Sequence, residues 1–465
     1  MMTETQKKNP LGEEKISKLL AGFAVPSIVA MLISSLYNIV DQIFIGQYVG
    51  DIGNAATNVA FPITTICIAI SVLAGVGGAS HFSIELGRGH KDEASKCLGN
   101  ALWLAGILGV TYTVIAFFFT EEMLSLFGGS GASLEYALYY TSVLIYGMPF
   151  LILTNVMSNF IRADGNPKYS MICMIIGAVI NIALDALFVS DWGFNWGMAG
   201  AAGATVISQI ISFVAAFLYI TRFKTVHINR HSFVFSLRKA MKIASLGMSN
   251  CINQVAICGV QIVMNNQLDT YGILEFSKEL AHIPQAAFGV VMKVNSLLIS
   301  FFVGMAQGSQ PIVGFNYGAR KLHRSKKTFL IAASTCFTVA LIGFFVFQFF
   351  PHAVISIFGS GVPEYNEFAE KTMRIFLSMI MFNGVQMTIA NYFSAIGKPI
   401  KGAILSLTRQ ILLIIPLMII LPKFMGLDGV LYSAPITDFT TFLLALGFIL
   451  YEFRNPEYKE RGLNE

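Results

Sequence analysis

Charged residues are scarce in this sequence, because Asp, Glu, Lys and Arg together make up only 12% of its 465 residues. Water-soluble domains usually carry about twice that fraction. Hydrophobic residues account for 55% of the chain, and the mean hydropathy is +0.66. The shortage of charge excludes an ordinary soluble globular protein and indicates an integral membrane protein.

Motifs typical of several protein classes are also missing. The chain has no G-x-x-x-x-G-K-[ST] phosphate loop, no H-E-x-x-H and no G-x-S-x-G, which argues against ATP hydrolysis and against a membrane-embedded hydrolase. The six cysteines show no zinc-type spacing, and the seven histidines are scattered. We therefore expect no enzyme activity and no cofactor.

Long apolar stretches are abundant. A helix needs about 20 apolar residues to cross the hydrocarbon core, and twelve stretches reach that length. Barrel strands would be shorter and would alternate in polarity. The predicted fold is an all-α membrane protein with twelve transmembrane helices. The predicted spans are 19–45, 56–86, 97–119, 136–160, 169–190, 198–222, 243–266, 281–310, 328–350, 370–394, 402–421 and 428–453.

Basic residues are concentrated on one side of these spans. With the N-terminus inside, 25 of the 31 Lys and Arg residues fall in the termini and in alternate connecting segments. Positively charged loops stay on the cytoplasmic side of a membrane. We therefore expect a multi-pass protein of the cell membrane with both termini cytoplasmic. The net charge of +5 follows from this asymmetry and does not indicate nucleic-acid binding.

The second half of the chain repeats the first. NFIRADGNP at 159–167 matches NYFSAIGKP at 391–399, LGRG at 86–89 matches YGAR at 317–320, and Gly197 and Gly200 match Gly426 and Gly429. The offset between matching residues is nearly the same at all these sites. Two six-helix bundles with a parallel repeat are one common design of secondary transporters. The predicted units are 1–222, a cytoplasmic linker at 223–242, and 243–465.

Two acidic residues lie deep in the apolar spans of the first half. Asp41 follows the polar stripe of Ser34, Tyr37 and Asn38, and Asp185 lies in VINIALDALFVS, one helical turn after Asn181. At a rise of about 1.5 Å per residue, both acids reach the outer half of the bilayer and can meet. A carboxylate in hydrocarbon costs at least about 2.5–3.5 kcal/mol, so intramembrane acids are usually functional. The alternative is that both acids only hydrogen-bond to neighbouring helices.

Several of these segments together resemble the multidrug and toxic compound extrusion (MATE) family. They are SLYNIVDQIFIGQYVG, NIALDALF, the LGRG and YGAR loops, and the paired ADGNP and AIGKP turns, and they cover essentially the whole chain. The resemblance is to the branch with DinF-like and MepA-like exporters, because 243–266 and 375–394 lack the acids of the NorM-like branch. It implies a proton or cation site formed by Asp41, Asn181 and Asp185, with Thr205 as the sixth-span participant. Asp41, Asn181 and Asp185 would act as metal ligands only if the coupling ion is Na⁺.

A substrate cavity is expected between the two halves. Sparse amides beside adaptable thioethers suit a loose pocket, and aromatic rings attract organic cations. Pro26 has no backbone N–H to donate to the carbonyl of Gly22, so the helix can bend there. Pro26 is therefore a candidate helix hinge, and the alternative is a tolerated kink without a role. The predicted cavity residues are Tyr37, Asn38, Asn155, Met157, Met379, Asn383 and Met387.

The resulting hypothesis is a monomeric antiporter, which exports lipophilic and often cationic small molecules against H⁺ or Na⁺ as the two bundles rock. A flippase for lipid-linked saccharides has a similar design, but its pyrophosphate substrate calls for several basic residues in the cavity. This sequence offers mainly Lys293 and Arg409. Arg409 is expected to pair with Asp438, and the role of Lys293 stays open.

Overall fold

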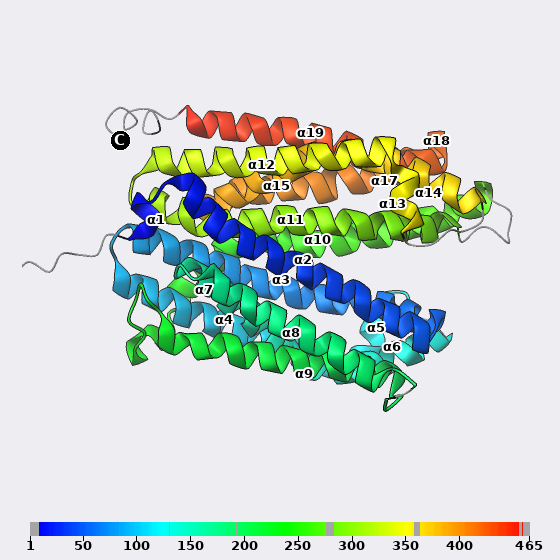
Figure 1. Ribbon diagram of the computed structural model, residues 1–465, viewed down its shortest axis with the longest axis horizontal. Helices are drawn as coiled ribbons and strands as arrows, with labels where there is room; N and C mark the ends of the chain where they lie inside the picture. Colours follow the sequence, from blue (N-terminus) through cyan, green and yellow to red (C-terminus); the bar gives the residue numbers. More distant parts are fainter. Residues whose placement is uncertain are drawn as a thin grey trace, which may run out of the picture.

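The computed structural model is a bundle of long helices that run roughly side by side (Figure 1). It describes residues 9–129, 131–191, 193–275, 283–357, 363–454 and 458, and these contain no β-strand. Eleven helical segments are long and apolar enough to span a membrane, and one further pair of helices forms a bent span. The prediction of an all-α protein with twelve spans is confirmed.

Each predicted span corresponds to a longer helix or to a set of consecutive helices. The first half contains α1 (Pro10–Glu13), α2 (Ile16–Tyr48), α3 (Asp51–Gly87), α4 (Lys91–Phe118), α5 (Thr120–Leu126), α6 (Gly131–Leu144), η1 (Ile145–Gly147), α7 (Met148–Ala163), α8 (Pro167–Phe188), α9 (Gly197–Phe217) and η2 (Leu218–Arg222). The second half contains α10 (Leu237–Glu275), α11 (Ile283–Gly318), α12 (Leu322–Phe349), α13 (Pro351–Ser356), α14 (Pro363–Phe376), α15 (Ile380–Ala395), α16 (Pro399–Leu407), η4 (Thr408–Ile414), α17 (Ile415–Ile420), α18 (Pro422–Met425) and α19 (Leu427–Phe453).

The internal repeat is visible in where the helices begin and end. Helix α4 begins at Lys91 and α12 at the equivalent Leu322, and the two helices also end at equivalent residues. The prolines that open α8 and α16, Pro167 and Pro399, are separated by nearly the same offset. Equivalent turns therefore stop and start the chain at equivalent positions in the two halves.

The tenth span is bent, whereas the sequence predicted one continuous segment at 370–394. Its two parts, α14 and α15, meet at an angle of 48° across residues 377–379. The equivalent fourth span is interrupted at the same place in the repeat, by the short 3₁₀ turn η1 between α6 and α7. Hydropathy does not predict where a transmembrane helix bends, because the residues on both sides of the bend are equally apolar.

The two halves interlock through a symmetric pair of glycines. A Cβ atom added at Gly87 of α3 would lie 2.1 Å from the carbonyl oxygen of Phe315 on α11. A Cβ atom added at Gly318 of α11 would lie 2.1 Å from the carbonyl oxygen of Ile84 on α3. The same repeat offset relates the two glycines and the two carbonyl groups. The crossing of α3 and α11 therefore marks the pseudo-two-fold axis between the halves.

Hydrogen bonds join the halves close to this crossing. Gln310 on α11 donates to the carbonyl oxygen of Val76 at 3.0 Å and to the hydroxyl of Ser80 at 2.8 Å. The short helix α1 and the residue after it precede the first span, but their backbone carbonyl groups accept hydrogen bonds from side chains of the second half. These contacts run from Asn316 to the Leu11 carbonyl (2.9 Å), from Lys321 to the Gly12 carbonyl (2.9 Å) and from Arg324 to the Glu14 carbonyl (2.6 Å).

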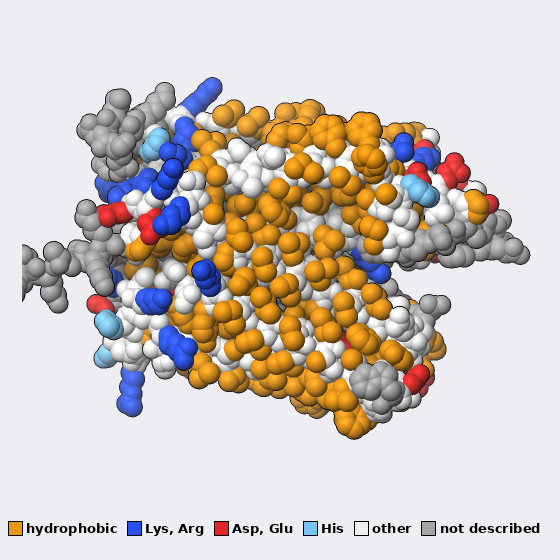
Figure 2. Space-filling model, in the orientation of Figure 1, with side chains coloured by type: hydrophobic (Ala, Val, Ile, Leu, Met, Phe, Trp, Pro, Cys, Tyr) orange, Lys and Arg blue, Asp and Glu red, His pale blue; other side chains and the backbone are white. Residues whose placement is uncertain are grey.

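The surface is divided into a basic end, an apolar belt and a hollowed far end (Figure 2). Lys and Arg side chains gather at the end where α1 lies and where α19 ends. At the opposite end a hollow separates the two halves. An apolar belt of this kind is the surface that lipid would cover. Five of the basic residues used to predict orientation lie outside the described residues, namely Lys7, Lys8, Lys278, Lys459 and Arg461.

The segment predicted as a linker at 223–242 is helical at its end, because α10 begins at Leu237. The preceding residues pack against the first half. The amide of Ser236 donates to Asn100 of α4 at 2.7 Å, and the indole of Trp103 donates to the carbonyl of Phe233 at 2.8 Å. The carboxylate of Asp164, which follows α7, accepts hydrogen bonds from the backbone amides of residues 224 and 225.

Candidate functional site

The two intramembrane acids of the first half lie next to each other. Helix α2 packs along α8, and the side chain of Asp41 on α2 faces that of Asp185 on α8. Asp185 is fully buried, and Asp41 is half-buried. Two carboxylates repel each other at this range, so the arrangement is stable only when a proton or another cation lies between them.

The amide of Asn181 extends this pair. Asn181 lies one turn before Asp185 on α8 and is buried. Its Nδ2 donates to the hydroxyl oxygen of Thr205 on α9 at 3.4 Å, and α8 packs against α9. The structure thus brings together the four residues Asp41, Asn181, Asp185 and Thr205, which come from three helices.

Several oxygens in this cluster have no hydrogen-bond donor among the described residues. They are Oδ1 of Asp41, both carboxylate oxygens of Asp185, and Oδ1 of Asn181. A buried acceptor without a donor costs about 1–3 kcal/mol, and more if it is charged. Carboxylate, amide and hydroxyl oxygens are the ligands that hard cations prefer. The cluster is therefore chemically suited to binding a proton or Na⁺.

Two tyrosines complete the surroundings of the carboxyl pair. Tyr37 lies one turn before Asp41 on α2, within electrostatic range of both acids. Tyr140 of α6 lies within range of both acids and of Tyr37, and it is buried. The sequence did not point to Tyr140, because the fourth span contains several tyrosines and periodicity does not tell which of them faces inward.

The predicted cavity residues fall into distinct environments. Asn38 is exposed, next to the acid pair on α2, and Asn155 on α7 is half-buried. Met379 lies at the bend of the tenth span, and Met387 is half-buried against the core. Met157 is completely buried in the hydrophobic core, so it packs the first half and does not line the hollow. The sequence misplaced Met157 because core-facing and cavity-facing sides of a membrane helix are equally apolar.

The second half contains a different polar centre. Arg409 and Asp438 were expected to pair, and this is confirmed: Nη2 of Arg409 lies 2.9 Å from Oδ1 of Asp438, and Nε donates to the same oxygen at 3.0 Å. The predicted cavity residue Asn383 is buried beside Asp438. Arg409 lies in the π-helical segment η4, and such segments often occur at functional sites.

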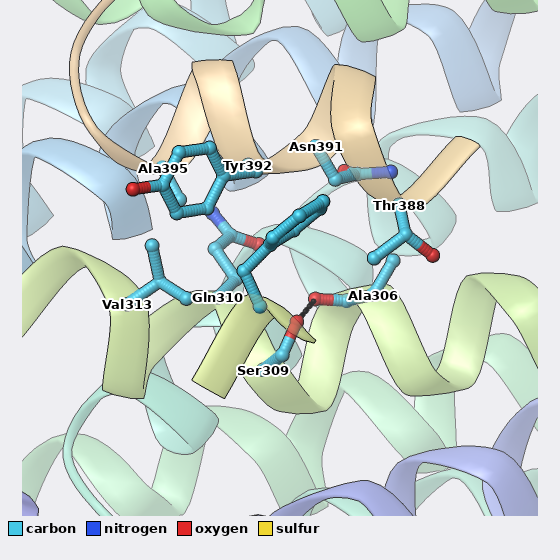
Figure 3. Close-up of a pocket in the computed structure, with 9 residues that line it drawn as sticks. Ala306, Ser309, Gln310, Val313, Thr388, Asn391, Tyr392 and Ala395 are labelled. Carbon is cyan, nitrogen blue, oxygen red and sulfur yellow. Dashed lines mark hydrogen bonds between the residues drawn. The ribbon is translucent and has the colours of Figure 1, made fainter. Parts of the chain in front are cut away.

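A small cavity also lies in the second half, between α11 and α15 (Figure 3). Polar groups of Ser309, Gln310, Thr388 and Asn391 line it, and Ser309 donates to the carbonyl of Ala306 at 2.9 Å. Its volume is about 10 Å³. That is room for a single water molecule, so this cavity is not a binding site for an organic compound.

The candidate hinge lies within a continuous helix. Pro26 is buried inside α2, which runs from Ile16 to Tyr48 without interruption. The hydroxyl of Ser27 donates to the carbonyl of Phe23 at 2.9 Å, one turn before. The backbone therefore lacks one hydrogen bond at Pro26 without a break in the helix.

Comparisons with known proteins agree with one another, and together they cover nearly all of the chain. A family model described as MatE matches residues 26–187 and 276–420. The chain is 26% identical, over 95% of both sequences, to the multidrug export protein MepA of Staphylococcus haemolyticus. It is 31% identical to the MATE multidrug transporter DinF-BH, which was solved in complex with a ligand, with a TM-score of 0.87 over 98% of this chain and 100% of that one. An outward-facing MATE family transporter of the MOP superfamily shares the fold, with 24% identity, a TM-score of 0.86 and coverage of 98% of this chain and 100% of that one.

Proposed function

The chain belongs to the MATE family, and from this premise we propose that it is an antiporter that exports lipophilic compounds in exchange for H⁺ or Na⁺. The relatives MepA and DinF-BH are described as a multidrug export protein and a multidrug transporter. The observation that carries the proposal is the cluster of buried acceptor oxygens at Asp41, Asp185 and Asn181, which lack donors among the described residues. A cation would satisfy them.

The hollow between the halves is the proposed substrate path. It opens at the end of the bundle that lies away from the basic loops. Because basic loops stay in the cytoplasm, this end is assigned to the outside and the basic end to the cytoplasm. The glycine crossing of Gly87 and Gly318 and the bonds of Gln310 then close the inner side. This orientation puts both termini in the cytoplasm.

Export and cation entry are coupled because the substrate and the cation compete for the same carboxylate oxygens. A cation from outside enters the hollow and binds between Asp41 and Asp185. It removes the negative charge that attracts a basic group of the substrate, and the substrate leaves. Rocking of the halves then exposes the loaded site to the cytoplasm, where the cation dissociates and a new substrate binds. The site is thus open to water on only one side of the membrane at each stage.

The test is dye efflux from proteoliposomes under an imposed gradient of either pH or Na⁺. Asp41→Asn and Asp185→Asn keep the size of the side chain but remove its charge, so gradient-driven efflux is expected to fall to the level of empty liposomes. Asp269→Asn is the matched control, because Asp269 is an exposed acid on α10. Wild-type efflux rates in Asp41→Asn or Asp185→Asn would falsify the proposed coupling site.

A further inference from the structure

Helices α2 and α11 form an antiparallel seam between the two halves. Two glycines of α11, Gly304 and Gly308, lie so close to α2 that an added Cβ atom would be 2.5–2.6 Å from a Cα atom of α2. Farther along the seam, the hydroxyl oxygens of Ser35 and Ser296 are 3.2 Å apart. The opposed pairs are Ala24 with Gly308, Ile28 with Gly304, and Ser35 with Ser296. The two residue numbers of each pair add up to nearly the same value, so the register of the seam is constant over these residues.

The same register places Lys293 opposite Asn38. Lys293 precedes Ser296 by three residues, and Asn38 follows Ser35 by three, so each lies on the facing side of its helix. Asn38 is exposed and Lys293 is half-buried, which puts this level of the seam inside the hollow. Figure 2 shows basic side-chain atoms within the hollow. Asp41 lies only about 4.5 Å farther along α2.

Lys293 has no acidic partner among the described residues. Arg409, another intramembrane cation of the second half, is neutralised by Asp438. Asp41 and Asp185 face each other within the first half. The half-buried Asp41 on α2 and the ammonium group of Lys293 on the facing helix α11 therefore lie at nearly the same depth in the membrane, and Asp185 is buried behind Asp41.

We propose that Lys293 is a specificity-determining residue, which selects lipophilic compounds that carry a carboxylate in addition to a basic group. This inference rests on the proposed export function. An ammonium group enclosed with an oily ligand loses hydration, and an anionic group on that ligand restores a counter-charge. A compound with only a positive charge brings a second cation to Lys293 and is disfavoured. The basic group of a zwitterion is still attracted to Asp41, which is the more exposed member of the acid pair.

The test compares two dyes that differ in one group. Rhodamine B carries a free carboxylate and is zwitterionic, whereas its ethyl ester is a cation of nearly equal size and lipophilicity. Binding to the purified full-length protein in detergent is measured by fluorescence anisotropy, which requires no transport. The wild type is expected to bind rhodamine B about 10-fold more tightly than the ester, the effect of one charge-assisted pair.

Lys293→Met keeps the length of the side chain without its charge, and it should abolish the preference while the ester still binds. Lys293→Arg should retain it. Lys423→Met is the matched control, because it removes an exposed lysine from α18 and should bind both dyes as the wild type does. If Lys293→Met does not fold, Lys293→Gln takes its place.

Equal wild-type affinities for the two dyes, or an unchanged ratio in Lys293→Met, would overturn the assignment of Lys293. Efflux of both dyes under imposed pH and Na⁺ gradients separates this result from the proposed function. Binding with the expected ratio but without gradient-driven efflux would support Lys293 and contradict antiport. Gradient-driven efflux without a preference between the dyes would support antiport and contradict the assignment of Lys293.

Discussion

The two halves of the molecule have the same helices but opposite polar chemistry. In the first half, Asp185 is buried and neither of its carboxylate oxygens has a donor among the described residues. In the second half, Asp438 is buried, accepts a hydrogen bond from Nε of Arg409 and forms an ion pair with Nη2 of the same guanidinium. A satisfied ion pair contributes to the packing of its own half. The oxygens of Asp185 that lack donors are the ones that the proposed cation would bind.

The same substitution should therefore have opposite effects in the two halves, and this is the largest difference that we predict. Asp438→Asn leaves the buried Arg409 without its counter-ion and should lower the free energy of unfolding by about 3–5 kcal/mol. Asp185→Asn removes an unpaired charge and should leave stability unchanged or raised, although export is lost. Thermal unfolding of the purified variants in detergent measures both.

The double variant Arg409→Met/Asp438→Leu serves as the control, because it removes both charges and should regain most of the stability that Asp438→Asn loses. An Asp438→Asn variant as stable as the wild type would contradict a structural role of the pair. A loss of equal size in Asp185→Asn would contradict the contrast between the halves.

An intermediate effect is expected where the halves are alike. Gly87→Ala and Gly318→Ala each bring a methyl group against a carbonyl oxygen of the opposite half. Each should cost about 1–3 kcal/mol of stability, and the double variant should cost less than the sum, because one separation of α3 from α11 relieves both clashes. Thermal unfolding is again the measurement.

Gly106→Ala provides the comparison, because no atom lies within 4 Å of a Cβ at Gly106 and a small gain from helix propensity is expected there. Strongly unequal losses at Gly87 and Gly318 would show that the crossing of the two helices is not symmetric in energy.

The smallest effect concerns the amide and hydroxyl beside the acid pair. Asn181→Ala or Thr205→Ala removes one neutral oxygen ligand and should weaken the apparent affinity for the coupling cation about 10-fold, or roughly 1.4 kcal/mol, without abolishing export. Dye efflux measured over a range of Na⁺ concentrations and pH values gives this affinity. Thr338→Ala, on the exposed side of α12, should not change it. An unchanged affinity in both variants would remove Asn181 and Thr205 from the site.

Sequence reasoning predicted the twelve spans, the repeat and the Arg409–Asp438 pair, because each depends on features that the membrane makes conspicuous. A charge in an apolar span needs a partner, and few partners exist at the same depth. The proximity of Asp41 and Asp185 followed from the same argument. The bend at residues 377–379 and the π-helical segment η4 could not be predicted, because both change the backbone without changing hydropathy.

The candidate cavity was predicted less well for a related physical reason. A soluble helix shows which side is buried, because its other side is polar. In this chain lipid-facing and core-facing sides are both apolar, so Met157 could not be told from a cavity residue. Tyr140 was missed because its neighbours in the span also include tyrosines. The placement of Lys293 required the register of α2 against α11, which only close contacts between the halves reveal.

If the halves rock as proposed, the position of the glycine crossings determines how far each group travels. In the proposed rocking of the halves, the close contact of Ala24 with Gly308 near one end of α2 would serve as the pivot. Asp41 lies about 17 residues beyond it, or roughly 25 Å along the helix. A tilt of about 10° at the pivot would shift Asp41 by roughly 4 Å, more than the length of a hydrogen bond. A small rotation at the tightly packed end would thus carry Asp41, together with Asp185 on the neighbouring α8, away from the facing helix α11 of the second half.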